Sequence, residues 1–167
     1  MRHGAFLRAA AFSVALALAG AGLTWGTAQG PAPSSSPAAP AAGLPEANQK
    51  LQSGDPAGAV KILEALTQRE PGNAEAWRLL GVANLRLKNL DPAESAFRKA
   101  LQLDPNLYLA MYGLAGVAAR RGDADRAFEW LSKVKATRKM DITFIQVDPN
   151  LESLRADPRF PKLLPAP

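Results

Sequence analysis

Few side chains in this sequence are suited to covalent or acid–base chemistry. The chain of 167 residues has no cysteine, and its one histidine, His3, stands close to the start. If the start is removed in the mature protein, the commonest general base and the commonest transition-metal ligands are absent. Ser95 and Ser153 then have no histidine that could activate them as nucleophiles. The sequence therefore predicts a non-enzymatic protein with no catalytic residue, no metal site and no cofactor.

Two pairs of closely spaced carboxylates, Asp91 with Glu94 and Asp123 with Asp125, are the remaining candidates for acid–base chemistry. Each pair lies where a helix is expected to begin, and carboxylates there accept hydrogen bonds from free backbone N–H groups. The run Asp123-Ala124-Asp125 also lacks the further ligands and the glycine of a calcium-binding loop. We therefore expect these carboxylates to cap helices.

The composition favours packed helices and gives no sign of a nucleic-acid partner. Hydrophobic residues make up 47% of the chain and aromatic residues only 7%, and many of the hydrophobic positions are alanine, which suits closely packed helices. The 20 basic and 15 acidic residues give a net charge of +5, with the two signs interspersed. Nucleic-acid binding would need basic residues clustered on one face or interleaved with aromatic ones.

A repeat of 34 residues organises the middle of the chain. The second stretch of each copy has apolar residues at this spacing: Ala59, Leu63 and Leu66, then Ala93, Phe97 and Ala100, then Ala127, Leu131 and Val134. The first stretch repeats in the last two copies, as Trp77, Leu80 and Gly81, then Met111, Leu114 and Ala115, whereas the first copy lacks this pattern. Turn signals separate the two stretches at Gly54-Asp55, Asn89 to Asp91 and Gly122-Asp123. The pattern predicts three helix–turn–helix units over about residues 43–73, 74–107 and 108–141.

Residues 1–28 have the pattern of a targeting segment. They combine a basic start, an uncharged apolar run over residues 9–23 and the small residues Gly26-Thr27-Ala28, which suit cleavage after Ala28. The apolar run has 15 residues, and a membrane span needs roughly 20. A cleaved signal peptide is therefore the expectation, and an uncleaved membrane anchor is the alternative.

The repeats are flanked by a linker and a C-terminal extension. Residues 29–42 are rich in proline, alanine and serine, which predicts a spacer without regular structure. Residues 142–167 contain Asp148-Pro149 and Asp157-Pro158, each typical of the start of a short helix. The buried side of these helices is expected to hold Leu151, Leu154, Phe160, Leu163 and Leu164. We expect this extension to cover the apolar edge of the last unit.

The central unit resembles a tetratricopeptide repeat, because Trp77, Leu80 and Gly81, then Ala93, Phe97 and Ala100, then Pro105 fall at that family's spacings. The resemblance covers residues 43–141. The string DPNLESLRADPRF at residues 148–160 is similar to the extension that closes many bacterial arrays of such repeats. The resemblance implies an all-α, right-handed α-solenoid of three units with short C-terminal capping helices. It also implies that the first helices line a concave face that binds peptides or partner helices.

Helical phase within that family pattern places a set of side chains on the concave face. The candidate partner-binding residues are Asn48, Gln52, Arg78, Val82, Arg86, Tyr112 and Arg120, with Leu51, Leu85, Gly116 and Ala119 beside them. The arginines could hold a carboxylate by forked hydrogen bonds, and Tyr112 could add a flat amphipathic contact. The alternative is that the arginines are only the solvated face of amphipathic helices. The family's carboxylate-binding clamp uses Lys and Asn residues across repeats that this sequence lacks, so we do not expect it.

These observations favour a non-enzymatic interaction scaffold or adaptor of the bacterial cell envelope. It would be periplasmic or secreted and would bind a protein or peptide on its concave face, with a partner that carries acidic groups as one option. The alternative is an accessory or assembly subunit of an envelope complex, anchored in the inner membrane and facing the periplasm. A membrane is expected as a partner only if the N-terminal segment is not cleaved.

Overall fold

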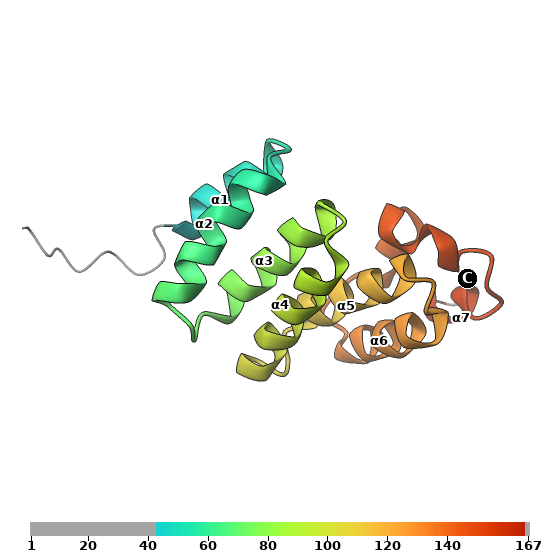
Figure 1. The fold of residues 1–167 in the computed structure, drawn as a ribbon. Coiled ribbons are helices and arrows are strands. Elements are labelled where there is room, and N and C mark those ends of the chain that lie inside the picture. Colours follow the sequence, from blue (N-terminus) through green and yellow to red (C-terminus); the bar gives the residue numbers. More distant parts are fainter. Residues whose placement is uncertain (1–42, 166–167) are drawn as a thin grey trace, which may run out of the picture. The chain divides into compact units, whose positions relative to one another are not determined.

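The computed structural model describes residues 43–165, so the expected targeting segment and linker lie outside the described residues. The described part is helical and contains no strand. Six helices form three successive pairs and are followed by three short helical turns (Figure 1): α1 (Gly43–Gln52) and α2 (Pro56–Arg69), α3 (Ala74–Arg86) and α4 (Leu90–Leu103), α5 (Tyr108–Arg120) and α6 (Ala124–Thr137), then η1 (Ile142–Gln146), η2 (Pro149–Leu154) and α7 (Phe160–Leu163). The predicted all-α solenoid of three helical pairs with a C-terminal cap is confirmed.

The core follows the 34-residue spacing of the sequence. The equivalent residues of the three second helices are at most 1% exposed: Ala59, Leu63 and Leu66 in α2, Ala93, Phe97 and Ala100 in α4, and Ala127, Leu131 and Val134 in α6. They contribute to three apolar clusters, one between the first and second pairs, one between the second and third, and one between the third pair and the extension. Each pair therefore relies on its neighbours to bury its apolar surface.

The ring of Phe97 explains two glycines of the first helices. A Cβ atom built on Gly81 of α3 would lie 2.6 Å from this ring, and one on Gly113 of α5 would lie 2.3 Å from it. These distances are well below a van der Waals contact, so a side chain at either position would force the helices apart. The two glycines let α3 and α5 approach the same buried aromatic ring.

The turn inside each pair is built alike, with one difference. Gly54 and Gly122 have positive φ angles of 79° and 78°, and the equivalent residue of the second pair is Lys88, with a φ of 63°. The residue after each of these donates its N–H to a carbonyl five residues back: Asp55 to Lys50, Asn89 to Asn84, and Asp123 to Ala118. Glycine adopts this left-handed conformation freely, whereas a lysine there is strained.

Side chains cap the start of three helices, and the cap at Asp123 was predicted from the sequence. The side chain of Asp55 accepts a hydrogen bond from the N–H of Gly58 at 2.8 Å, that of Asn73 from Ala76 at 3.0 Å, and that of Asp123 from Arg126 at 3.1 Å. Each satisfies one of the backbone donors that the first turn of a helix leaves free. These caps fix where α2, α3 and α6 begin.

The capping role predicted for Asp91, Glu94 and Asp125 is wrong. Both Asp91 and Glu94 form ion pairs with Arg121, which belongs to the next helical pair. Asp125 instead pairs with Arg159 of the C-terminal extension at 2.6 Å. Helical periodicity gives only the neighbours within one helix, so it could not show these pairings across units. The three carboxylates hold successive units together.

The C-terminal extension covers the last helical pair, as its apolar pattern predicts. Leu151, Leu154, Phe160 and Leu163 are buried in one cluster with side chains of α5 and α6, and Leu164 is half-buried against it. The turn η1 was not predicted; it starts at Asp141, whose carboxylate accepts from the N–H of Thr143 at 2.9 Å. Within residues 43–165, no helix is both long and apolar enough to span a membrane.

Candidate partner-binding groove

The first helices of the pairs, α1, α3 and α5, present equivalent positions on the side away from their paired helices. We call this side of α3 and α5 the inner face: Arg78, Val82 and Arg86 on α3, and Tyr112, Gly116 and Arg120 on α5. Each α5 residue lies 34 positions after its α3 equivalent. The buried Phe97 and its two glycines fix how α3 and α5 pack together. This packing aligns the equivalent side chains of the two helices.

A cavity of about 190 Å³ lies between α3, α5 and the C-terminal extension. Its walls are Arg78, Val82, Leu85, Arg86, Phe97, Leu109, Tyr112, Gly113, Gly116, Asp148 and Asn150. The structure thus brings together four of the seven predicted residues: Arg78, Val82, Arg86 and Tyr112. Leu85, expected on the same side, lines the cavity but is only 6% exposed, because it also fills the core between the second and third pairs.

The two arginines of α3 already have partners in the protein. Arg78 binds the carboxylate of Glu75 through two nitrogens, Nε at 2.7 Å and Nη2 at 2.5 Å. Arg86 donates from Nη1 to the main-chain carbonyl of Leu51 in α1 at 2.5 Å. Arg78 is therefore neutralised by an ion pair, whereas Arg86 keeps an uncompensated positive charge beside the cavity.

The inner face of α5 is covered by the extension. The hydroxyl of Tyr112 donates to Oδ2 of Asp148 at 2.5 Å, and Nε of Arg120 donates to Oδ1 of Asn150 at 2.9 Å. Ser153 donates to the carbonyl of Ala119 at 3.1 Å. Burial and the bond to Asp148 both raise the pKa of Tyr112 above its ordinary value. The phenol therefore remains protonated and acts as a hydrogen-bond donor at neutral pH.

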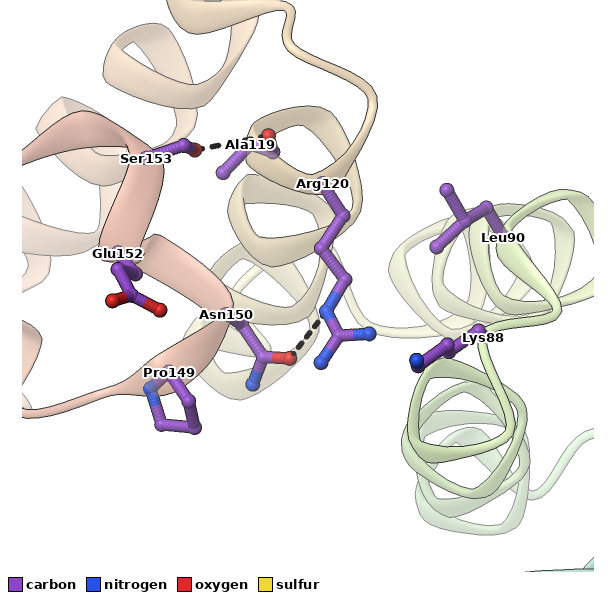
Figure 2. A pocket seen from close by; sticks show the side chains of 8 residues that line it. All are labelled: Lys88, Leu90, Ala119, Arg120, Pro149, Asn150, Glu152 and Ser153. Atoms are coloured by element: carbon purple, nitrogen blue, oxygen red, sulfur yellow. Dashed lines mark hydrogen bonds between the residues drawn. The ribbon is translucent and has the colours of Figure 1, made fainter.

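A second, more open pocket of about 530 Å³ lies beside the first and shares Asn150 with it. Figure 2 shows its lining, with Lys88 and Leu90 on one side and the extension on the other. The extension supplies Pro149, Asn150, Glu152 and Ser153, and α5 supplies Ala119 and Arg120. Arg120, the fifth predicted residue, therefore faces this pocket.

The remaining two predicted residues lie apart from both pockets. Asn48 is half-buried and Gln52 is exposed, and both belong to α1, at positions equivalent to Val82 and Arg86. The pockets form where α3, α5 and the extension meet, which leaves α1 outside them. Asn48 and Gln52 stay predictions for a partner that extends further along the first helices.

Among the lining residues that the sequence did not assign to the site are Lys88, Asp148 and Asn150. The position of Lys88 was signalled by the spacing, since it falls 34 residues after Gly54 and 34 before Gly122. Asp148 and Asn150 could have been found from the string DPNL, which occurs at residues 104–107 and again at 148–151. In both copies the aspartate accepts from the N–H two residues later, at 2.9 Å in the first and 2.7 Å in the second. The extension therefore starts like a further repeat.

Three cations beside the pockets have no carboxylate partner among the described residues. Among residues 43–165, Arg86, Lys88 and Arg120 form no ion pair, whereas Arg121, Arg126, Lys133 and Arg159 each bind a carboxylate. Glu152 is the acidic residue on the wall of the open pocket, and it pairs with none of the three cations. In the same range no group of three or more His, Asp or Glu side chains is placed to hold a metal ion.

Comparison with known proteins identifies the repeat. The family model described as tetratricopeptide repeat matches residues 44–108 and 93–140, which together span more than half of the chain. Human superkiller complex protein 3 is 39% identical over 59 residues, which are 35% of this chain and 4% of that protein. Mouse PEX5-related protein is 34% identical over 70 residues, or 42% of this chain and 12% of that protein. The chain thus spans only a small part of these curated relatives.

Solved structures show the same arrangement of helices. A crystal structure of MamA shares 25% sequence identity with a TM-score of 0.57, over 65% of this chain and 62% of that one. A mutant O-GlcNAc transferase of Thermobaculum terrenum shares 29% identity with a TM-score of 0.56, over 58% of this chain and 19% of that one. The family match, the core residues spaced 34 positions apart and the paired helices agree: this chain belongs to the tetratricopeptide repeat family.

Proposed function

We propose that this protein is a non-enzymatic interaction scaffold that binds a peptide or partner helix along the inner face of its repeats. Tetratricopeptide repeat proteins act as protein–protein interaction scaffolds. The observation that carries the proposal is a pair of adjoining pockets: the smaller lies between α3, α5 and the extension, and the open one between the α3–α4 turn, α5 and the extension. In both, apolar walls adjoin cations that form no ion pair among residues 43–165. Apolar clefts with a few fixed polar groups are the usual form of a binding site.

The finer part of the proposal concerns the cell compartment and rests on the sequence of residues 1–28. We propose that the protein works in a bacterial cell envelope, in the periplasm or outside the cell. The alternative is an accessory subunit held at the inner membrane by an uncleaved N-terminal segment. Mass spectrometry of the exported protein separates these: an N-terminus at Gln29 supports cleavage, and an intact N-terminus supports the anchor.

Site-specific photo-crosslinking tests which face binds the partner. A photoreactive phenylalanine analogue replaces Val82, whose side chain lines the smaller pocket, in the full chain expressed in its native cell. The matched control places it at Ser95, which is exposed on the neighbouring helix α4 and lines neither pocket. A partner docked on the inner face should be captured from position 82 and not from position 95.

The outcome decides between the two faces of the solenoid. Capture of one partner at position 82 alone supports the proposal. Capture of the same partner at position 95 with equal or greater yield would place the binding surface on the second helices and contradict it. A third position, Gln52, controls for an inactive crosslinker. This residue is exposed on α1 and should give a product if the partner extends along the first helices.

A further inference from the structure

We propose that the open pocket between the α3–α4 turn and the C-terminal extension binds an acidic residue of an extended peptide, with its carboxylate between Arg120 and Lys88. This inference rests on the proposed scaffold function and specifies the partner chemistry of the same groove. It also assigns the C-terminal extension a part in recognition, in addition to covering the core.

The guanidinium of Arg120 is held ready for a carboxylate. Its Nε donates to Oδ1 of Asn150 at 2.9 Å, which fixes the plane of the group and leaves both terminal nitrogens free. Figure 2 shows one of those terminal nitrogens pointing toward Lys88. Two parallel N–H donors of one arginine match the two oxygens of a carboxylate. Asn150 is therefore a positioning residue, supplied by the extension.

Lys88 supplies the second charge from an unusual backbone position. Its φ of 63° places it in the left-handed region, where the equivalent residues of the other two turns are glycines. The side chain lines the pocket opposite the extension, and it forms no ion pair among residues 43–165. Figure 2 shows Lys88 across the pocket from Arg120 of the next repeat, and an anion bound between the two cations would relieve their repulsion.

The rest of the pocket limits what can bind there. Leu90, Ala119 and Pro149 give apolar surface beside the two cations, which suits an apolar side chain next to the acidic one. Glu152 lies on the wall formed by the extension and opposes a negative ligand. The carbonyl ends of α3 and α5 also carry partial negative charge. An isolated acidic residue should therefore bind weakly, on the order of millimolar, with the rest of a partner adding affinity.

The test is an NMR titration of the full chain labelled with ¹⁵N. The probe is acetyl-Leu-Glu-amide, and the matched control is acetyl-Leu-Gln-amide, which has nearly the same shape without the charge. The glutamate peptide should shift the amide signals of Arg120, Asn150 and Ser153 and bind about fivefold more tightly than the glutamine peptide, a ratio in the range of exposed charge pairs. Raising the salt from 0.05 M to 0.5 M should abolish that difference.

Single substitutions test which residues produce the preference for the glutamate peptide. Arg120→Gln and Lys88→Gln should each bring the affinity for the glutamate peptide close to that for the glutamine peptide, and Glu152→Gln should increase it about twofold. Lys61→Gln removes an exposed lysine of α2 that lines neither pocket, so it should change nothing. A retained ¹⁵N spectrum in each variant shows that the fold is intact.

Two results overturn the proposal. Equal affinity for the two peptides, including no binding of either, rules out carboxylate recognition in this pocket. A preference for glutamate that survives both Arg120→Gln and Lys88→Gln places the carboxylate elsewhere. Neither result contradicts the scaffold function, which the crosslinking at Val82 tests separately, because a partner could dock through the smaller apolar pocket alone.

Discussion

Helices α3 and α5 occupy equivalent positions in consecutive repeats, but their inner faces have different neighbours. On α3, Arg78, Val82 and Arg86 face a cavity. On α5, the equivalent Tyr112, Gly116 and Arg120 face the C-terminal extension, and Tyr112 and Arg120 are hydrogen-bonded to it. The inner face of α3 thus lines a cavity, while α5 uses the same positions both to line the two pockets and to hold a segment of its own chain.

The difference shows how the extension changes the end of the solenoid. A following repeat would pack its first helix mainly on the second helix before it, as α3 does on α2 and α5 on α4. The extension starts with the same DPNL string as the third repeat, yet η2 packs mainly on α5, the first helix. It therefore lies across the inner face and forms one wall of both pockets. The end of the array is also part of its candidate binding site.

The largest expected effect comes from the ring that both helices share. Phe97→Ala should lower the free energy of unfolding by about 3–5 kcal/mol, because the ring is fully buried against both Gly81 and Gly113. Urea unfolding followed by circular dichroism measures this loss. Leu103→Ala, on the same helix but 37% exposed, should change the value by no more than about 0.5 kcal/mol. Similar losses for the two would show that Phe97 does not set the register.

A smaller change tests whether the extension is held by α5. Tyr112→Phe removes the hydroxyl that donates to Asp148, a carboxylate only 6% exposed, and should cost about 1–3 kcal/mol. Tyr108→Phe is the matched control, because that tyrosine lies on the same helix without a hydrogen bond from its hydroxyl to described residues. Thermal unfolding of the two variants gives the comparison. Equal melting temperatures would mean that the apolar contacts alone hold the extension.

Lys88→Gly tests the strain in the turn that precedes α4. Glycine adopts the left-handed conformation without cost but adds flexibility to the unfolded chain, so the net gain in stability should be about 0.5–1 kcal/mol. Gly122→Ala, at the equivalent turn, should be destabilising instead. Chemical denaturation of both variants checks the opposite signs. A loss of stability in Lys88→Gly would show that the lysine contributes a contact that outweighs its strain.

The smallest effect is a pH dependence of stability that arises within the extension. Hydrogen bonds from the side chain and backbone of Arg159 lower the pKa of Asp157 to about 2. Because the folded pKa lies below the unfolded value, this contribution is complete above about pH 4 and is lost as the pH falls toward 2. Asp157→Asn should therefore flatten the fall in melting temperature between pH 4 and pH 2. An unchanged slope in that range would assign the acid sensitivity to other carboxylates.

The fold could be predicted from the sequence because its determinants recur at a fixed spacing. Ala93, Phe97 and their equivalents are core positions in every repeat, and Asp55, Asn73 and Asp123 cap helices through bonds within one turn. Leu87 continues the apolar pattern of the preceding helix, but it is 36% exposed because α3 ends at Arg86 and Leu87 caps it. Local patterns thus identified the helices better than their ends.

The candidate site could be predicted only in part, because its contacts join distant segments. Helical phase gave Arg78, Val82, Arg86, Tyr112 and Arg120, all of which line one of the two pockets. It could not show that Glu75 neutralises Arg78, since a surface arginine three residues from a glutamate has several possible partners. Nor could it place Asp148 and Asn150 against α5, because the path of the extension depends on packing between segments 30 or more residues apart.

The central claim is that the inner face binds the partner, and one measurement tests it most directly. The partner captured by crosslinking is titrated against the full chain and against two double variants by isothermal titration calorimetry. Arg78→Glu with Arg86→Glu changes the inner face of α3, and Arg98→Glu with Lys99→Glu makes the same change of charge on α4. We predict at least about a tenfold weaker affinity for the first and an unchanged affinity for the second. Equal affinity of the wild-type chain and the inner-face variant would contradict the account.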